Sequence, residues 1–476
     1  MGVDVGCGPD SVGAKFLTES ARMPSYTCFK AYDIRGQLGE ELNEEIALRV
    51  GRAFGEVLKA RRVVIGRDPR GSSLALAGAV TEGLMLAGCE VLDLSLCGTE
   101  EMYFAVSHLG ADGGIEVTAS HNPMNYNGLK MVRRGSAPLA AANGLAAIKA
   151  LAESGNFAAS QSGTWQERLD VRADYVNRVL SFVDVGALRP LKIVVNAGNG
   201  AAGPTFDAIA LGLAARGAPI EFVRMYHTPD GSFPNGIPNP LLPENQPATA
   251  QAVIAAGADM GVAWDGDFDR CFLFDHRGDF VAGEYVVGLL AQVFMAKEPG
   301  ARIIHDPRVI WNTMDVVARG GGVALAAPTG HAFLKQKMRD VGAIYGGEMS
   351  AHHYFRDFMA CDSGMIPWLV VAELLGRSGQ SLADLLAARR AAFPSSGEIN
   401  FRVADVRATV ARIEGVYAPL AVRREDLDGL SLEFGAWRFN LRASNTEPLL
   451  RLNVESRGRV DLVQQAVAEI SALIDG

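Results

Sequence analysis

A repeated alternation of short apolar strands with helices constrains the fold more than any other feature of the 476-residue chain. Its first cycle comprises helix 43–60, strand 63–66, helix 72–87, strand 90–94, a helix near 100–108 and strand 114–118. The alternation returns between residues 192 and 264, and again between residues 302 and 345. Strands that alternate with helices build βαβ units around parallel or mixed sheets. The chain is therefore predicted to contain three successive α/β domains.

The sequence changes character from about Phe393. The predicted elements of this tail are strands 398–403, 430–434, 437–441 and 449–454 and helices 406–417 and 460–474. They indicate a C-terminal α+β domain with an antiparallel sheet. Residues 153–166 are interpreted as a domain connection, and 391–397 as a hinge. The expected division is an N-terminal extension 1–27, α/β domains 28–165, 166–279 and 280–391, and the α+β domain 392–476.

Charge and cysteine content narrow the classes of partner. With 45 Lys and Arg against 54 Asp and Glu, the net charge of −9 argues against nucleic acid or an anionic membrane as main partner. The six cysteines form neither a C-x-x-C pair nor a zinc spacing, which is typical of reduced thiols in a cytoplasmic protein. No apolar run approaches the ~20 residues of a membrane span, residues 1–24 lack a secretory signal, and no obligate protein partner is evident.

One polar loop follows the strand 114–118. It reads Thr-Ala-Ser-His-Asn-Pro-Met-Asn-Tyr-Asn-Gly-Leu-Lys over residues 118–130. Ser120 could act as a nucleophile, and His121 and Lys130 could carry protons, because a loop at the end of a buried strand is both rigidly held and accessible. Taken alone, the stretch could equally be a polar surface turn.

Three aspartates follow the predicted strand 260–264. Asp265, Asp267 and Asp269 are spaced as in a loop that wraps a hard cation with oxygen ligands. An EF-hand does not fit, because its sixth position would need glycine and holds Arg270, and its twelfth would need glutamate and holds His276. Three carboxylates leave coordination positions open, which favours Mg²⁺ that also binds a phosphate oxygen.

A glycine-rich turn, Gly198-Asn-Gly-Ala-Ala-Gly203, leaves open a different function. It follows a strand and opens a helix, as in a dinucleotide-binding fingerprint. The fingerprint needs an acidic residue at the end of the next strand, where Arg224 stands instead. The turn is therefore better interpreted as a packing and capping turn, with a nicotinamide-dependent oxidoreductase as a weak alternative.

Three further loops carry groups that could bind a sugar phosphate. His331 opens a helix, and Glu348 and Ser350 follow a strand, so all three are expected at strand ends where open α/β sheets bind ligands. Arg442 begins the turn Arg-Ala-Ser-Asn-Thr-Glu-Pro, and Arg451 lies on the following strand. Guanidinium, hydroxyl and amide donors in one turn are suited to holding phosphate.

These loops resemble those of the α-D-phosphohexomutase superfamily, and within it the bacterial phosphomannomutase/phosphoglucomutase family. The resemblance runs from about residue 28 to the C-terminus and rests on the motifs F-K-A-Y-D-I-R-G, T-A-S-H-N-P, D-G-D-F-D-R, G-E-M-S and R-A-S-N-T-E-P, in family order. It implies four domains around one cleft. It also implies that Ser120 is phosphorylated and that Asp265, Asp267 and Asp269 hold Mg²⁺ together with that phosphate.

The resemblance further assigns roles inside the cleft. Ser120, His121, Lys130 and Arg35 would be catalytic, with Lys130 a candidate general acid or base. The residues implied to bind substrate are Tyr32, Arg270, Arg308, Thr329, Gly330, His331, Glu348, Ser350, Arg442, Ser444, Asn445, Thr446 and Arg451. Arg308 stands where the family has a lysine, so its contact is the least direct inference.

The implied reaction moves a phosphoryl group between the 6- and 1-positions of mannose or glucose. Phosphoserine would donate to the free hydroxyl, and a hexose 1,6-bisphosphate would turn over before returning its other phosphoryl group. The alternatives are a phosphoglucosamine mutase of the same fold and a sugar-phosphate binder without catalysis. A Ser-His-Asp hydrolase is disfavoured, because Ser120 lacks the G-x-S-x-G surround.

Overall fold

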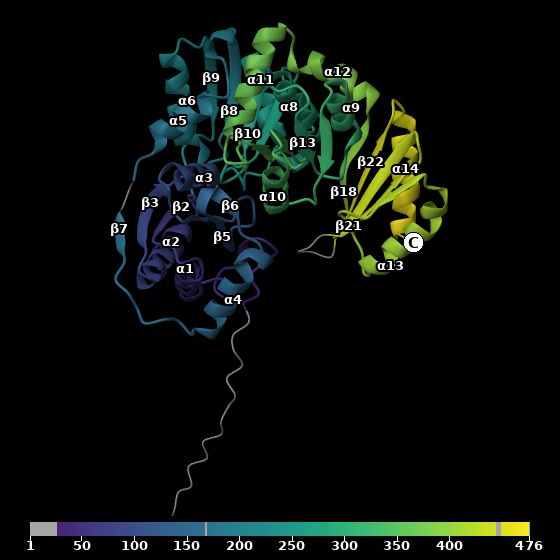
Figure 1. The fold of residues 1–476 in the computed structure, drawn as a ribbon. Coiled ribbons are helices and arrows are strands. Elements are labelled where there is room, and N and C mark those ends of the chain that lie inside the picture. The colour runs from purple at the N-terminus through teal and green to yellow at the C-terminus, as the bar shows by residue number, and fades with distance from the viewer. Residues whose placement is uncertain (1–25, 167–168, 444–448, 476) are drawn as a thin grey trace, which may run out of the picture.

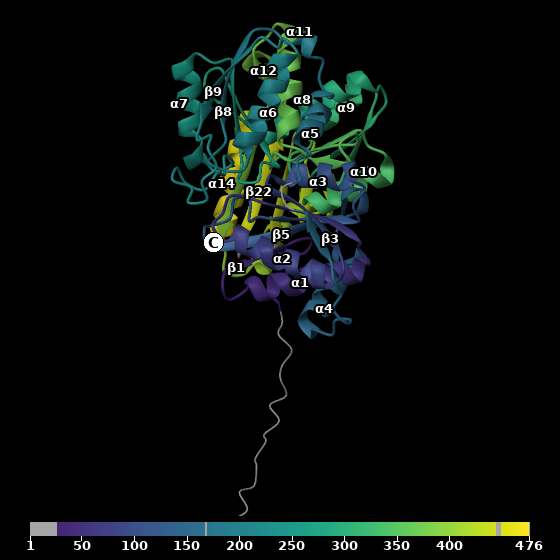
Figure 2. The same cartoon turned by 90° about the vertical axis from the view of Figure 1, so that its left-hand side faces the viewer.

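The computed structural model describes residues 26–166, 169–443 and 449–475. Their strands form four sheets, one in each of four successive units. The first unit lies below the second and third in both views, and the fourth unit, in yellow, lies beside the third (Figures 1 and 2). No helix in the described ranges combines the length and the apolar character that a membrane span requires.

The first unit is a mixed sheet with helices on its faces. Its elements are β1 (Ile34–Gln37), α1 (Glu44–Leu58), β2 (Arg62–Arg67), α2 (Ser73–Leu86), β3 (Glu90–Leu96), α3 (Thr99–His108), β4 (Gly113–Val117), β5 (Tyr126–Arg133), β6 (Ala137–Pro138), α4 (Leu145–Ser154) and β7 (Thr164–Gln166). The sheet order is β1-β5-β4-β2-β3-β7, with β6 beside β5. Strands β4, β2, β3 and β7 run parallel, whereas β5 is antiparallel to β4 and β1. The connection expected at 153–166 is shorter than predicted, because β7 joins this sheet.

The second and third units repeat the α/β pattern with five strands each. The second comprises α5 (Arg172–Leu180), β8 (Leu191–Asn196), α6 (Ala202–Ala215), β9 (Ile220–Met225), α7 (Pro247–Ala256), β10 (Met260–Trp264), β11 (Cys271–Asp275) and β12 (Phe280–Val281). The third comprises α8 (Gly283–Lys297), β13 (Arg302–His305), α9 (Trp311–Arg319), β14 (Val323–Ala326), α10 (His331–Val341), β15 (Tyr345–Gly347), β16 (His353–Phe355), β17 (Cys361–Asp362), α11 (Met365–Ser378) and α12 (Leu382–Ala392). Their sheet orders are β12-β11-β10-β8-β9 and β14-β13-β15-β16-β17.

The fourth unit is an antiparallel sheet with two helices, as predicted. Its elements are β18 (Ser395–Arg402), α13 (Val406–Tyr417), β19 (Arg423–Glu425), β20 (Leu430–Glu433), β21 (Trp437–Ala443), β22 (Leu449–Ser456) and α14 (Val460–Asp475). The strand order is β18-β22-β21-β20-β19. Only residues 393 and 394 separate α12 from β18, so most of the expected hinge 391–397 lies within regular elements.

Local sequence signals set several helix starts. The side chain of Asn43 accepts a hydrogen bond from Ile46 N at 3.0 Å before α1. Asp405 caps α13 in the same way, through Ala408 N at 2.9 Å. Such side chains satisfy amide groups that have no partner inside the helix, so they fix where the helix begins.

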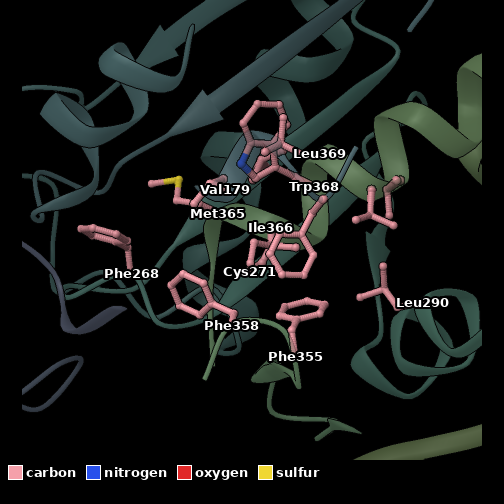
Figure 3. Packing of buried hydrophobic residues seen from close by; sticks show 14 of the residues in the cluster. Val179, Phe268, Cys271, Leu290, Phe355, Phe358, Met365, Ile366, Trp368 and Leu369 are labelled. Carbon is pink, nitrogen blue, oxygen red and sulfur yellow. The ribbon is translucent and has the colours of Figure 1, made fainter. Parts of the chain in front are cut away.

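One apolar cluster crosses the boundaries between the first three units. One cluster joins side chains of α3 to those of α5, α6, β10, α8 and α11, and Figure 3 shows a central part of it around Trp368, Ile366 and Phe355. The fourth unit has a separate core, which includes Phe439, Leu452 and Ile470. The first three units therefore share apolar packing, although the first unit also has a large cluster of its own, which includes Phe54, Val63 and Ile115. The core of the fourth unit is separate from both clusters.

Candidate active site

Ser120 lies in the loop between β4 and β5 with a left-handed backbone, at a φ of 51°. Its amide donates to Thr118 Oγ1 at 2.8 Å, and the Thr118 hydroxyl donates to Asp68 Oδ2 at 2.8 Å. A positive φ is uncommon for a residue with a side chain and is sustained only where the surroundings fix it. The loop therefore presents one serine hydroxyl in a fixed direction.

The buried side chain of Arg70, which belongs to none of the predicted motifs, supports the serine loop. Arg70 Nη2 donates to Ser120 O at 3.0 Å and to Asn122 O at 2.6 Å, and its Nη1 donates to Pro123 O at 3.0 Å. Three backbone carbonyls thus accept hydrogen bonds from one guanidinium, whose N–H donors are held in a fixed planar arrangement. The signal in the sequence is the Asp-Pro-Arg turn after β2, which lies about fifty residues before the serine.

The aspartate loop between β10 and β11 meets the serine loop directly. Ser120 Oγ donates to Asp265 Oδ2 at 2.5 Å. A Cβ at Gly266 would lie 2.5 Å from Ser120 O, so this close approach of two backbones requires glycine. The predicted nucleophile of the first unit and the predicted cation loop of the second therefore form one site.

The three aspartates offer buried oxygens to a cation. The Oδ1 atoms of Asp265 and Asp267 are buried without a hydrogen-bond partner, and Asp269 Oδ1, also buried, lies 3.5 Å from His352 Nε2. One carboxylate oxygen from each can approach a common point, because the three groups lie within 4.8 Å of one another. Burial, followed by the charges of Asp267 and Asp269, raises the pKa of Asp265 to about 7. Such crowding of hard oxygen donors fits a divalent cation such as Mg²⁺.

Lys130, on β5, contacts the same aspartates. Its Nζ lies 2.6 Å from Asp267 Oδ2 and 2.5 Å from Asp269 Oδ2. Burial acts to lower the pKa of Lys130, but the two carboxylates outweigh it and raise the pKa above its ordinary value. In this arrangement Lys130 is a cation that can neutralise charge or give a proton, which speaks against its use as the general base.

His121 is placed to exchange a proton with the serine. Its Nδ1 lies 2.9 Å from Ser120 Oγ. Burial, followed by the charges of Arg270 and Arg35, lowers the pKa of His121 well below its ordinary value, so the ring is neutral near pH 7. A neutral imidazole can accept a proton, which makes His121 the better-placed base.

Two of the predicted arginines border this site. Arg35 Nη1 donates to Asn122 Oδ1 at 2.8 Å and its Nη2 to Asp33 Oδ2 at 3.0 Å. Arg270 Nε lies 3.7 Å from Asp265 Oδ2. Both guanidinium groups therefore lie beside the residues that would surround a phosphate on Ser120.

The third unit brings its predicted sugar-binding residues together. Glu348 Oε1 accepts from Gly330 N at 2.9 Å, and its Oε2 accepts from the Tyr354 hydroxyl at 2.5 Å. The ring of His331 packs edge-on against that of Tyr32 from the first unit, with centroids 4.7 Å apart. The loops after β14 and β15 therefore lie against the start of the first unit.

His352, which sequence reasoning did not select, bridges the cation loop and the sugar loop. Its Nε2 lies 3.5 Å from Asp269 Oδ1 and its Nδ1 lies 3.4 Å from Glu348 Oε2. Burial and Arg270 act to lower the pKa of His352, but Asp269 and Glu348 outweigh them and raise it to about 9. Its position four residues after Glu348 is the only sequence signal for this role.

Arg308 is buried between the third and fourth units. Its Nη2 donates to Asp306 Oδ2 at 2.8 Å and lies 3.4 Å from Ser350 Oγ, while Nη1 donates to Glu398 Oε2 at 3.2 Å. Arg451 Nη1 lies 3.5 Å from the other oxygen of Glu398. The predicted substrate residues Arg308 and Arg451 thus meet at the Glu398 carboxylate, and Ser350 lies beside Arg308.

Arg442 is held by a second carboxylate at the same boundary. Its Nη1 donates to Asp428 Oδ2 at 3.3 Å, and the same oxygen accepts from Thr329 N at 3.1 Å. Along β21 the apolar side chains of Trp437, Phe439 and Leu441 alternate with polar ones, which leaves Arg442 on the polar side, and that side is also buried. The predicted residues Ser444, Asn445 and Thr446 lie outside the described residues.

The glycine-rich turn packs against the aspartate loop. Ala201 N donates to Gly266 O at 2.9 Å, and a Cβ at Gly200 would lie 2.7 Å from the same oxygen. A Cβ at Gly203 would lie 1.9 Å from His227 O. These glycines are used for close packing, which favours the packing interpretation over the nicotinamide alternative.

Comparison with known proteins covers almost the whole chain. The alpha/beta/alpha domains I, II and III of phosphoglucomutase/phosphomannomutase match residues 27–159, 173–278 and 282–393, and the C-terminal domain matches residues 398–473. The chain is similar to a phosphomannomutase of Salmonella montevideo, with 58% identity over 456 residues that cover 95% of this chain and 100% of the relative.

Two further likenesses agree with this match. Phosphohexose mutases of Xanthomonas campestris pv. campestris are 54% identical over 448 residues, covering 94% of this chain and 99% of the relative. A crystal structure of a phosphoglucomutase/phosphomannomutase family protein from Burkholderia thailandensis has a TM-score of 0.83 at 33% identity, covering 94% of this chain and 97% of the other. The chain therefore belongs to the phosphoglucomutase/phosphomannomutase family of enzymes, within the α-D-phosphohexomutase superfamily.

Proposed function

We propose that this protein interconverts hexose 6-phosphate and hexose 1-phosphate, with mannose or glucose as the sugar, through a phosphoserine at residue 120. The names of the similar proteins support a phosphohexomutase. The observation that carries the proposal is the contact of Ser120 Oγ with Asp265 Oδ2 at 2.5 Å, made by a serine whose φ is 51°. A phosphoryl group on this hydroxyl would lie beside the aspartate loop.

The reaction consists of two phosphoryl transfers. In the first, the bond from phosphorus to Ser120 Oγ breaks and a bond to the free sugar hydroxyl forms, giving a hexose 1,6-bisphosphate. The hydroxyl proton passes through a base to Ser120 Oγ as this oxygen leaves phosphorus. Neutral His121, whose Nδ1 lies 2.9 Å from Ser120 Oγ, is a candidate for the base. After the bisphosphate turns, its other phosphoryl group returns to Ser120, and the hydroxyl left on the sugar regains the proton.

Charge neutralisation matters more than covalent chemistry in such transfers. Asp265, Asp267 and Asp269, together with the phosphate on Ser120, would hold Mg²⁺, which would neutralise charge on the transferring group. Lys130 and Arg35 add positive charge from the first unit. Arg308, Arg442 and Arg451 would hold the phosphate that does not react.

Recognition of the sugar would come from the third unit. Glu348 and Ser350 would bond the 3- and 4-hydroxyls, which glucose and mannose share, whereas the two sugars differ only at C2. A site that does not contact C2 cannot discriminate strongly there. Glu348→Ala is therefore expected to raise KM for both sugar phosphates alike. Loss of only one sugar in a coupled assay over glucose, mannose and glucosamine phosphates would contradict this interpretation.

The phosphoserine can be tested by intact mass spectrometry. We expect a fraction of the purified protein to be heavier by about 80 Da, the mass of one phosphoryl group, and this species to increase after incubation with glucose 1,6-bisphosphate. It should vanish in Ser120→Ala. Ser136→Ala is a matched control, because Ser136 is another buried serine with a φ of 56°. An active protein with a single unmodified mass under both conditions would contradict the proposal.

A further inference from the structure

The start of helix α3 touches the aspartate loop across the boundary between the first two units. The hydroxyl of Thr99 donates to Asp267 Oδ2 at 2.6 Å, and its amide donates to Asp267 O at 3.2 Å. Both residues are completely buried. One residue of the first unit therefore contacts both the side chain and the backbone of a predicted cation ligand.

The contact is enforced by close packing next to it. A Cβ at Gly98 would lie 2.1 Å from Cε1 of the Phe268 ring, so glycine is required before the helix. Phe268 itself has a left-handed backbone, with a φ of 46°, and lies at the margin of the shared core (Figure 3). The aspartate loop cannot shift relative to α3 without disturbing this packing.

The next two residues anchor the helix start to the other units. Glu101 accepts from Arg172 Nε and from Thr205 Oγ1 of the second unit, each at 2.9 Å. Glu100 accepts from the hydroxyl of Ser363 at 3.0 Å and from Met365 N at 3.3 Å in the third unit. These hydrogen bonds fix the start of α3 and therefore the position of Thr99.

Thr99 also determines which oxygen of Asp267 remains free. Asp267 Oδ2 accepts from Thr99 Oγ1 and from Lys130 Nζ, both at 2.6 Å, whereas Oδ1 has no partner. The lysine is long and flexible and also bonds Asp269. Thr99 is β-branched with a restricted χ1, so its hydroxyl supplies the more directional of the two contacts.

We propose that Thr99 is a positioning residue that orients the Asp267 carboxylate so that Oδ1 faces the divalent cation. The inference rests on the proposed function, because it assumes that Asp267 is a ligand. The inference goes beyond the proposed function, because it assigns the orientation of the Asp267 carboxylate to a residue of the first unit. Binding of the cation is thereby coupled to the correct placement of the serine loop against the aspartate loop.

Mn²⁺ binding, followed by the electron paramagnetic resonance signal of the free ion, tests this role without relying on turnover. Loss of a group that orients a metal ligand typically weakens binding 10–100-fold, so we expect Thr99→Val to weaken Mn²⁺ binding at least about tenfold. Thr99→Ser keeps the hydroxyl and should stay within about threefold of wild type. Thr409→Val removes a buried hydroxyl of the fourth unit, which donates to Asp405 O, and should bind Mn²⁺ as wild type does.

The outcomes separate the two proposals. Equal Mn²⁺ affinity in wild type and Thr99→Val, or equal weakening in Thr409→Val, would overturn the positioning role. Equal affinity in wild type and Asp267→Asn would instead overturn the aspartate loop as the cation site. In the assay, Thr99→Val should lower kcat with KM for the sugar phosphate unchanged. If Thr99→Val does not fold, Thr99→Ala compared with Thr99→Ser decides the same question.

Discussion

Two buried glutamates occupy equivalent places at two different domain boundaries. Glu100, from the first unit, accepts hydrogen bonds from Gly364 N and Met365 N at the start of α11. Glu455, from β22 of the fourth unit, accepts from Ile310 N at 2.8 Å and Trp311 N at 3.0 Å at the start of α9. Each carboxylate thus satisfies amides at the N-terminus of a helix in the third unit.

The surroundings of the two glutamates differ. Glu100 is at a boundary where one apolar cluster continues through three units. Glu455 pairs with Arg438 at 2.7 Å, and the apolar contact beside it is a small cluster around Ile310, Trp311 and Phe393. The first boundary resembles the inside of a single domain. The second consists largely of charged and hydrogen-bonded groups, as at interfaces that allow relative motion.

The two boundaries also separate the predicted transfer site from the predicted phosphate-binding arginines. Ser120 and the three aspartates, the predicted transfer site, belong to the first two units, which share the large apolar cluster. Arg442 and Arg451, the predicted phosphate-binding arginines, belong to the fourth unit, whose contacts with the third include Glu398 and Asp428 as well as Glu455. We infer that the fourth unit acts as a clamp, because a bisphosphate that turns end for end has to be both gripped and released.

The largest effect on activity is expected from substitutions in the aspartate loop. Asp267→Asn should lower activity roughly 10²-fold or more, as for removal of a preorganised electrostatic group, while leaving the melting temperature nearly unchanged. Asp275→Asn is the matched control, because Asp275 is buried in the same sheet but lies outside the site. Equal turnover with and without a chelator would contradict the role of the aspartate loop.

A smaller effect is expected from the clamp. Arg442→Lys should raise KM about tenfold, the equivalent of one charge-assisted hydrogen bond, because lysine cannot bind phosphate in a bidentate manner. Phosphorylation of Ser120, read by intact mass, should remain. Arg423→Lys, an exposed arginine of the same unit, serves as the control. A drop in kcat with KM unchanged would place Arg442 with the reacting groups instead.

The smallest effect on activity is expected at the first boundary, where a change of pH acts on the stability contributed by buried Glu100. Burial raises the pKa of Glu100 to about 8, against the effect of hydrogen bonds from Tyr175 and Ser363. A raised pKa favours the protonated form in the folded state, so this contribution to stability is lost as pH rises from about 4 to 8. The melting temperature of Glu100→Gln minus that of wild type should therefore increase over this range. A constant difference would show that Glu100 does not titrate there.

Local patterns predicted most elements of the fold. The helix predicted at 43–60 and the strands predicted for the fourth unit are confirmed, with small shifts of their ends. Helices α8 and α11 were missed, because their residues are buried on nearly all sides and show no amphipathic period. The third predicted alternation ends at residue 345, two residues before the end of β15, since the glycines of β15 carry no side-chain pattern.

The site was predictable only where a motif carries its own chemistry. Ser120 and the aspartates stand in distinctive loops. Thr99 contacts Asp267 across 168 positions in the sequence, and Arg70 supports the serine loop from 50 positions away. Such contacts depend on how whole units pack, which periodicity and spacing do not encode. The hydrogen bonds of Glu100 and Glu455 to helix N-termini could not be predicted either, because they too depend on how the units pack.

Small-angle scattering, with and without saturating glucose 1,6-bisphosphate, tests the central claim that a separate fourth unit closes against the first three units. The account predicts a smaller radius of gyration in the presence of the bisphosphate. It also predicts a weaker response in Arg442→Lys at the same concentration. Identical scattering profiles with and without ligand, at a concentration that saturates turnover, would contradict the clamp.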